Sequence, residues 1–273
     1  MKCLGGDGQS LCGWERGTGA QRVVLLHGVG DHARIWDPVT AALADGARTL
    51  ALDLRGHGDS AWSPDRSYAR EAFFRDLERV MRDLGEPETV LVGHSLGGSL
   101  ALEYASRYPE SVSRLVLVDV GPELGAPAVR RLRQGLRDQL PVFADVAAYR
   151  AHLAARYWLA DPEALGEFAR HGARPGPGGV IPKLDPAAVG VLEDRDAGRD
   201  VWAELGRVRC PTLVLRATGS AVLARATAQK MVEEALALGS LEEVPRSGHA
   251  LLLDNPGDAA DRIRRFLLPH HEV

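Results

Sequence analysis

A series of short, uninterrupted apolar runs constrains the fold of this chain more than any other feature of its sequence. The runs, each bounded by turn-forming residues, are 23–26, 49–54, 89–92, 115–118 and 212–215. Continuous apolarity is typical of strands that are covered on both faces, as in a parallel sheet. Amphipathic helical patterns lie between the runs, at 68–84, 95–108, 224–238 and 258–268. This alternation predicts an α/β fold with a doubly wound, mostly parallel sheet.

The alternation stops between residues 121 and 208. That stretch contains helix-like segments at 127–140 and 146–159 and a loop rich in Gly and Pro at 172–182, without a convincing strand. We therefore predict a core made of residues 1–120 and 209–273. A mostly helical lid, 121–208, is inserted after the sixth strand. The loop at 172–182 could be a hinge, but a plain solvent-exposed loop is favoured.

Composition excludes several classes of partner. The chain has 273 residues and a formal net charge of −4, which argues against binding to nucleic acid or to an anionic membrane. No uncharged stretch approaches the roughly 18 apolar residues of a membrane span. Cys3, Cys12 and Cys210 form no metal-binding cluster, and the N-terminus lacks the apolar run of a signal peptide. We expect a cytoplasmic protein with a small-molecule substrate and neither metal nor cofactor.

The segment around Ser95 predicts a catalytic nucleophile. Residues 93–97 read Gly-His-Ser-Leu-Gly and lie between an apolar strand and a helix that opens with small residues. In a G-x-S-x-G turn the nucleophile takes a strained backbone conformation, and its neighbours must be Gly because strand and helix nearly touch. The helix N-terminus also places free N–H groups near developing negative charge. The alternative, a helix-capping Ser after a Gly turn, is less consistent with this context.

Two further segments supply partners for Ser95. Residues 25–30, Leu-Leu-His-Gly-Val-Gly, end an earlier strand, and the backbone N–H groups of Val29 and Leu96 are candidates for an oxyanion hole. We expect His27 in this segment to be structural. His249 follows the strand-like segment 241–244 and comes last in the chain, as the order Ser, acid, His requires. It is therefore the candidate base.

With these motifs, the chain resembles the α/β-hydrolase superfamily, in particular its small, lid-bearing branch of esterases, C–C hydrolases and haloperoxidase-like proteins. The resemblance covers nearly the whole chain outside the lid. Residues 53–60 match the family's D-x-R-G-x-G-x-S signature, for which we expect a structural role. Ser95 at the nucleophile position argues against the haloalkane dehalogenase and epoxide hydrolase branches, which attack with Asp.

The usual catalytic acid of that family is missing. The resemblance places it just after the strand at 212–215, where this sequence has Ala221. Asp119 is a candidate replacement because it ends the strand at 115–118, at the sheet edge where catalytic groups of α/β folds gather. Another carboxylate, or no acid at all, are the alternatives left open.

These residues predict a serine hydrolase that cleaves a small ester, thioester or lactone through an acyl-enzyme on Ser95. C–C bond hydrolysis and lyase or cyclase chemistry would use most of the same residues. The missing acid also leaves open a ligand sensor with an impaired site. The sequence indicates neither the substrate nor the oligomeric state.

Overall fold

A computed structural model describes residues 2–4, 10–123, 130, 133–136, 142–193 and 198–268 of the chain. Its centre is an eight-stranded sheet of order β1-β2-β4-β3-β5-β6-β9-β10. The strands are β1 (Lys2–Leu4), β2 (Leu11–Arg16), β3 (Gln21–Leu26), β4 (Ala47–Leu52), β5 (Thr89–His94), β6 (Val112–Val118), β9 (Thr212–Ala217) and β10 (Gly239–Val244). From β4 to β10 all neighbouring strands are parallel, while β1 and β2 pair antiparallel at one edge.

The apolar runs become strands because both faces of the sheet are covered. Alternate residues of β3 enter two separate apolar clusters, with Val24 and Leu26 on one face and Val23 and Leu25 on the other. All six residues of β5 are buried. The predicted doubly wound, mostly parallel sheet is confirmed, and the antiparallel β1 and β2 were not foreseen.

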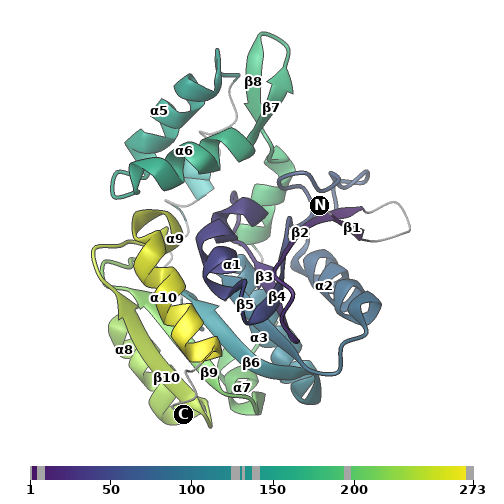
Figure 1. The fold of residues 1–273 in the computed structure, drawn as a ribbon, viewed down its shortest axis with the longest axis vertical. Coiled ribbons are helices and arrows are strands. Elements are labelled where there is room, and N and C mark those ends of the chain that lie inside the picture. The colour runs from purple at the N-terminus through teal and green to yellow at the C-terminus, as the bar shows by residue number, and fades with distance from the viewer. Residues whose placement is uncertain are drawn as a thin grey trace.

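Helices cover the sheet in two layers (Figure 1). One layer contains α1 (Asp37–Leu43) and α10 (Pro256–Leu267), whose buried side chains join the cluster of Val23 and Leu25. The opposite layer contains α2 (Arg70–Leu84), α3 (Leu96–Arg107), α7 (Val201–Arg207) and α8 (Arg225–Lys230), which pack into the other cluster. The amphipathic patterns read from the sequence therefore form helices with their apolar faces against the sheet.

The segment that follows β6 carries α5 (Val146–Arg156), α6 (Pro162–His171) and a hairpin of β7 (Ala173–Gly176) with β8 (Gly179–Pro182). Figure 1 shows these elements gathered above one end of the sheet. A 3-10 helix (Pro186–Glu193) leads from the hairpin toward α7, which packs on α3 of the core. Most of the helix expected at 127–140 lies outside the described residues.

The hairpin corrects the expectation that 121–208 contains no strand and that 172–182 is an open loop. Gly178 and Gly179 take φ values of +83° and +147°, which let the chain reverse between the two strands. Val180 also exchanges two backbone hydrogen bonds with Phe143. Both the turn and the Phe143 contact depend on backbone geometry that a Gly- and Pro-rich composition does not reveal.

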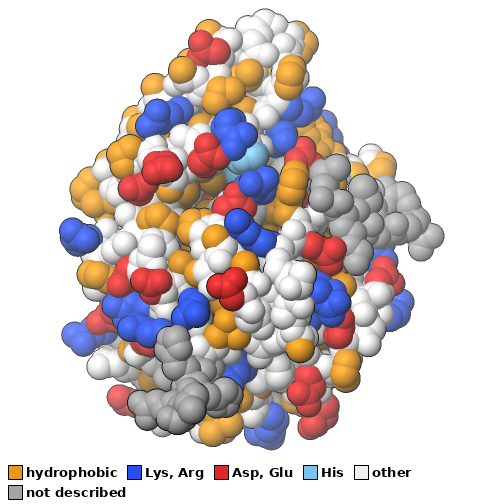
Figure 2. Space-filling model, in the orientation of Figure 1, with side chains coloured by type: hydrophobic (Ala, Val, Ile, Leu, Met, Phe, Trp, Pro, Cys, Tyr) orange, Lys and Arg blue, Asp and Glu red, His pale blue; other side chains and the backbone are white. Residues whose placement is uncertain are grey.

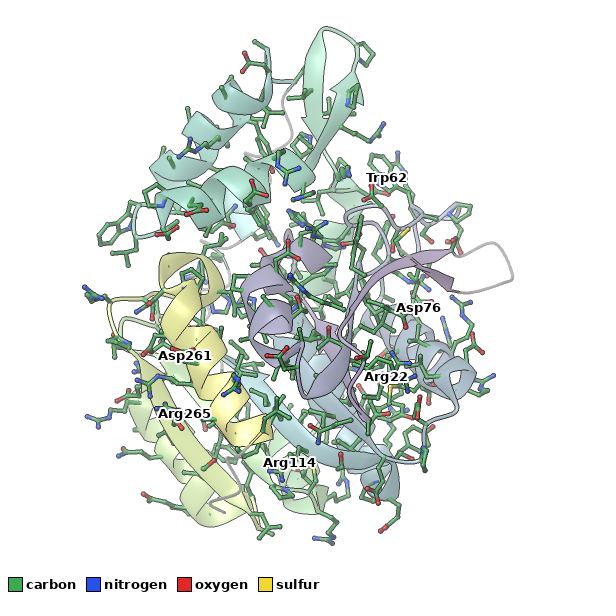
Figure 3. All side chains as sticks on the ribbon, viewed as in Figure 1. Arg22, Trp62, Asp76, Arg114, Asp261 and Arg265 are labelled. Carbon is green, nitrogen blue, oxygen red and sulfur yellow. The ribbon has the colours of Figure 1, made fainter. Side chains whose placement is uncertain are left out.

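Several contacts tie this segment to the core. Lys183 Nζ lies 2.6 Å from Asp59 Oδ1, and the Tyr68 hydroxyl donates to Asp185 Oδ2 at 2.6 Å. Trp62 lies near the base of the hairpin (Figure 3). The guanidinium carbon of Arg174 in β7 is 5.5 Å from the centre of its ring.

On the face shown in Figure 2, acidic and basic side chains are interspersed, without a continuous patch of one sign. No helix in the described part of the chain is long and apolar enough to cross a membrane.

Candidate active site

Ser95 stands alone between β5 and α3 in a strained conformation. Its φ and ψ are 51° and −113°, in a region that non-glycine residues rarely occupy. The tight turn also explains the neighbouring glycines. A Cβ on Gly93 would stand 2.4 Å from the carbonyl oxygen of Gly97, and one on Gly97 would stand 2.2 Å from that of Leu26. Helix α3 therefore lies directly against β3 and β5, and the strain at Ser95 is held by this packing.

The predicted nucleophile, base and replacement acid lie together in a chain of hydrogen bonds. His249 Nε2 is 3.2 Å from Ser95 Oγ, and His249 Nδ1 is 2.8 Å from Asp119 Oδ2. Ser95 is 6% exposed and Asp119 is fully buried. Because a buried carboxylate accepts from Nδ1, the neutral imidazole carries its proton there and presents the Nε2 lone pair to Ser95.

Asp119 is fixed by more than its contact with His249. It leaves β6 with φ of 47°, a left-handed conformation that Asp tolerates better than most residues. Its Oδ1 accepts from the backbone N–H of Ala217 at 3.0 Å, and its Oδ2 accepts from the Ser220 hydroxyl at 2.6 Å. With Nδ1 of His249, three donors therefore fix the orientation of this buried carboxylate.

Ser220 is a residue that sequence reasoning missed. Its Oγ also accepts from the backbone N–H groups of Val222 and Leu223, so it fixes the turn in which the usual acid was expected. Ala221, the residue at that position, is exposed. Nothing in the sequence distinguishes Ser220 from an ordinary turn serine, because its partner Asp119 is 101 positions away.

A second buried carboxylate–imidazole pair lies beside Ser95. His94 Nδ1 is 3.3 Å from Asp31 Oδ2, and His94 Nε2 is 2.9 Å from the backbone oxygen of His249. Both partners are acceptors, so this arrangement favours the doubly protonated imidazolium form of His94. Burial opposes this charge, but the hydrogen bond and charge of Asp31 prevail and raise the pKa of His94.

The rings of His94 and His249 are close enough for the charge of one to affect the pKa of the other, since their centres are 4.8 Å apart. Burial lowers the pKa of His249; the hydrogen bond to Asp119 works against this effect and the charge of His94 works with it. A base must be neutral to accept a proton, so the lowered pKa keeps His249 ready at neutral pH.

A pocket of about 230 Å³ opens onto Ser95 and His249. Its lining comes from the core loops and from the end of α5: Gly28, Val29, Asp31, Ile35, His94, Ser95, Arg156, Tyr157, Trp158, Leu159, Gly248, His249, Ala250 and Asp254. Nowhere in the described part of the chain do three or more His, Cys, Asp or Glu side chains form a group suited to a metal ion.

The sequence profile described as the alpha/beta hydrolase family matches residues 23–262. The chain belongs to the alpha/beta hydrolase family. The match spans the predicted nucleophile, acid and base, and it agrees with the resemblance drawn from the motifs.

Individual relatives of this alpha/beta hydrolase are also enzymes. The chain is 29% identical to 2-(acetamidomethylene)succinate hydrolase of Mesorhizobium japonicum over 216 residues, which are 79% of this chain and 77% of that protein. It is 44% identical to Esterase Rv0045c of Mycobacterium tuberculosis over 106 residues, 39% of this chain and 35% of the esterase. A crystal structure of E-2-(acetamidomethylene)succinate hydrolase superposes with a TM-score of 0.85 and 27% identity, covering 95% of both chains. Together with the family match, these named relatives show that the chain is a hydrolase-like enzyme.

The loop that follows β3 in this hydrolase lies against the nucleophile. A Cβ on Gly28 would stand 3.2 Å from Ser95 Cβ, so only Gly fits there without displacement. Neither the Val29 nor the Leu96 backbone N–H donates a hydrogen bond to another residue that the structure describes. His27 stays out of the pocket: its Nδ1 donates to Gly28 O at 2.7 Å, while its Nε2 accepts from the Leu54 N–H at 2.9 Å.

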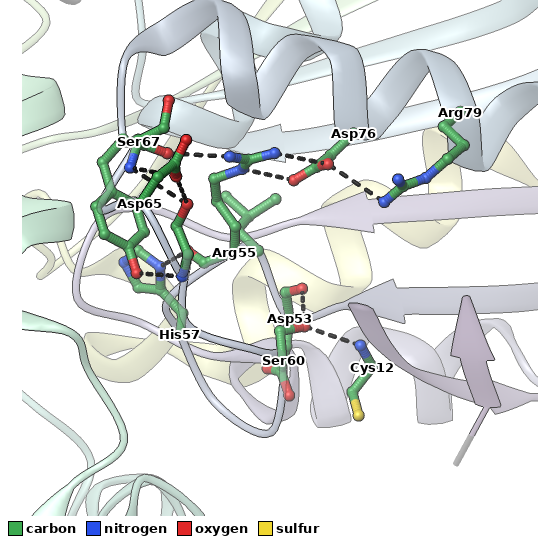
Figure 4. A network of polar contacts seen from close by, with 12 residues as sticks. Cys12, Asp53, Arg55, His57, Ser60, Asp65, Ser67, Asp76 and Arg79 are labelled. Atoms are coloured by element: carbon green, nitrogen blue, oxygen red, sulfur yellow. Dashed lines mark hydrogen bonds and ion pairs between the residues drawn. The ribbon is translucent and has the colours of Figure 1, made fainter. Parts of the chain in front are cut away.

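The D-x-R-G-x-G-x-S segment forms a polar network away from Ser95 (Figure 4). Arg55 Nε donates to Asp76 Oδ2 of α2 at 2.7 Å, and the Ser60 hydroxyl donates to the backbone oxygen of Asp53 at 2.6 Å. The Cys12 N–H donates to Ser60 Oγ at 2.8 Å. These contacts join β2, the loop after β4 and α2, as the structural role expected for this segment requires.

Proposed function

We infer that this protein is a serine hydrolase that cleaves a small ester, thioester or lactone through an acyl-enzyme on Ser95. The observation that carries the proposal is the hydrogen-bond chain from Ser95 Oγ through His249 to Asp119 Oδ2. Such a chain activates a serine hydroxyl that is otherwise a weak nucleophile.

The proposed reaction has two halves. His249 Nε2 takes the proton of Ser95 as Oγ attacks the substrate carbonyl, and the protonated imidazole then gives that proton to the leaving group. Water next attacks the acyl group, with His249 again as base, and the carboxylic acid and free Ser95 are released. No metal or cofactor is invoked for either half.

The tetrahedral intermediate carries a negative oxygen that needs donors. The backbone N–H groups of Leu96 and Val29 are our candidates, because both lie next to Ser95 in the fold and neither is used by another described residue. Leu96 also begins α3, so the helix dipole favours negative charge at this point.

We propose Asp119 as the acid of the triad, in place of the position held by Ala221. Three donors, which are the Ala217 N–H, the Ser220 hydroxyl and Nδ1 of His249, fix its carboxylate opposite the imidazole. In this role it fixes the imidazole tautomer and stabilises the imidazolium that forms during attack.

We further propose that residues 121–208 act as a lid, with 1–120 and 209–273 as the core. The support is that Arg156, Tyr157, Trp158 and Leu159 line the pocket over Ser95. The names of the relatives, an acetamidomethylene succinate hydrolase and an esterase, are consistent with acyl transfer to water. A cytoplasmic location stays a prediction.

The decisive experiment is labelling of the intact protein with a fluorophosphonate probe, read by mass spectrometry. We expect one probe per chain in the wild type and none in Ser95→Ala. A folded wild-type protein that stays unlabelled would mean that Ser95 is not activated, and a sensor or non-hydrolytic role would then replace the proposal.

A further inference from the structure

One charged side chain in the pocket is not used by the chemistry proposed above. Arg156, the last residue of α5, lines the same pocket of about 230 Å³ as Ser95 and His249. Its side chain is only partly exposed, so the guanidinium is a cation at the wall of the pocket.

Among the described residues, the half-buried Arg156 guanidinium has no carboxylate partner, unlike the buried arginines Arg55 and Arg216. Its Nη1 is buried without a hydrogen bond, and no ion pair joins it to a carboxylate among the described residues. By contrast, Arg55 pairs with Asp76 and Arg216 pairs with Glu243, each at 2.7 Å. The buried Nη1 of this half-buried guanidinium is a donor without an acceptor among the described residues, so an anionic ligand could satisfy it with a charge-assisted hydrogen bond.

Neighbouring groups hold Arg156 in place. The centre of the Tyr157 ring lies 5.0 Å from its guanidinium carbon, Cζ. On another side, a Cβ added to Gly135 would stand 3.1 Å from the same Cζ, so the guanidinium lies against the backbone there. A cation positioned before the ligand binds loses little side-chain freedom on binding, which favours a planar, bidentate partner such as a carboxylate.

The carboxylates that line the pocket have other partners, so they do not compete with an anion for Arg156. Asp31 is already paired with His94, whose Nδ1 lies 3.3 Å from its Oδ2. Asp254 accepts the backbone N–H of Gly248 at 2.8 Å, and burial raises its pKa. Neither carboxylate pairs with Arg156, so the guanidinium remains available to a substrate.

We propose that Arg156 binds a carboxylate of the substrate, so that the enzyme acts on small esters that carry an acid group besides the bond that is cleaved. The proposal rests on the hydrolase function assigned to Ser95. A pocket below the roughly 300–1,000 Å³ of drug-sized sites suits such a short acid.

The test compares acidic esters with neutral ones of similar size. The first pair is mono-4-nitrophenyl glutarate and 4-nitrophenyl pentanoate, with the charge on the acyl part. The second is 4-carboxyphenyl acetate and 4-nitrophenyl acetate, with the charge on the leaving group. We expect a higher kcat/KM for the acidic member of at least one pair. In Arg156→Gln this preference falls by about 10- to 100-fold, as for loss of a charge-assisted hydrogen bond.

Arg150→Gln is the matched control, because Arg150 is exposed on the same helix and, within the described part of the chain, donates to the backbone of Pro162 alone. It should leave the preference unchanged. Arg156→Lys keeps the charge but loses the planar fork, and we expect an intermediate preference. An equal loss for acidic and neutral esters in Arg156→Gln would overturn the proposal.

A binding measurement separates this proposal from the function of Ser95. Glutarate should bind the catalytically inert Ser95→Ala variant in calorimetric titration, and the added Arg156→Gln change should weaken binding about tenfold or more. Failure of fluorophosphonate labelling with glutarate binding intact would refute only the hydrolase. Normal labelling with no effect of Arg156→Gln on either measurement would refute only the carboxylate site.

Discussion

At the level of a single residue, Asp119 is the proposed acid, in place of the position after β9 where the family resemblance predicts one. Its carboxylate reaches His249 from the end of β6, while the turn after β9 supplies only the supporting hydroxyl of Ser220. An acid needs a place opposite Nδ1 of the base, and the strand from which it comes does not matter for that geometry.

Asp119→Asn should lower esterase turnover by about two to four orders of magnitude without unfolding the protein, because an amide N–H opposite Nδ1 favours the wrong imidazole tautomer. Turnover of a 4-nitrophenyl ester and the thermal midpoint are to be measured together. Ser220→Ala removes one donor to the carboxylate and should have a smaller effect. Full activity in Asp119→Asn would eliminate Asp119 as the acid.

The pair of His94 and Asp31 predicts a pH effect. In the proposed mechanism His249 must be neutral, so we expect kcat/KM to rise with pH through the pKa of that residue, which lies below its ordinary value of 6.5. His94→Gln removes a cation that lowers this pKa and leaves the charge of Asp31, which raises it. We therefore expect the acidic limb of the pH profile to move to higher pH.

The control for that shift is His171→Gln, a histidine that does not line the pocket. It should leave the acidic limb in place. An unmoved or lower limb in His94→Gln would show that His94 does not carry the charge that its two acceptors imply.

Among the elements, the contact of α3 with β3 and β5 decides whether the nucleophile turn can form. A Cβ at position 97 meets backbone atoms of Leu26 and His27, which cannot rotate away as a side chain can. The glycine at this position is thus required by the approach of helix to strand.

Gly97→Ala should reduce the free energy of unfolding by about 1–3 kcal/mol or more, as expected when a packed interior is overfilled. Urea unfolding followed by circular dichroism measures the change. Gly206→Ala in α7 is the control, because a Cβ there has no neighbour within 4 Å. It should be neutral or stabilising by up to about 1 kcal/mol. Equal stability of the two variants would contradict the steric argument.

Strands and helices with a strong hydrophobic pattern could be predicted from the sequence, while the β7–β8 hairpin could not. The buried strands β3 to β6 and β9 follow from continuous apolar runs, and α2 and α10 follow from their apolar stripes. The β7–β8 hairpin was not predicted, because Gly- and Pro-rich segments form either open loops or tight turns. Its pairing is fixed by the positive φ values of Gly178 and Gly179 and by the contact of Val180 with Phe143.

For the molecule as a whole, the sheet brings distant parts of the chain to one edge. Ser95, Asp119 and His249 follow β5, β6 and β10, and Arg156 comes to the same pocket from α5 in the segment between β6 and β9. The core segments supply the proposed chemistry, and the intervening segment supplies the proposed carboxylate site. The two can therefore be altered separately by mutation.

The sequence alone determined the class of fold, the nucleophile turn and the candidate base, because hydrophobic periodicity and short motifs are local properties of the chain. It also directed attention to Asp119 through the rule that catalytic groups gather at the carboxyl ends of parallel strands. Only the tertiary structure decided which groups touch. The contacts of Ser220 with Asp119 and of His94 with Asp31 join residues far apart in the chain, and the placement of Arg156 beside Ser95 in one pocket does the same. Such contacts follow from packing distances of a few ångströms, which local sequence patterns do not encode.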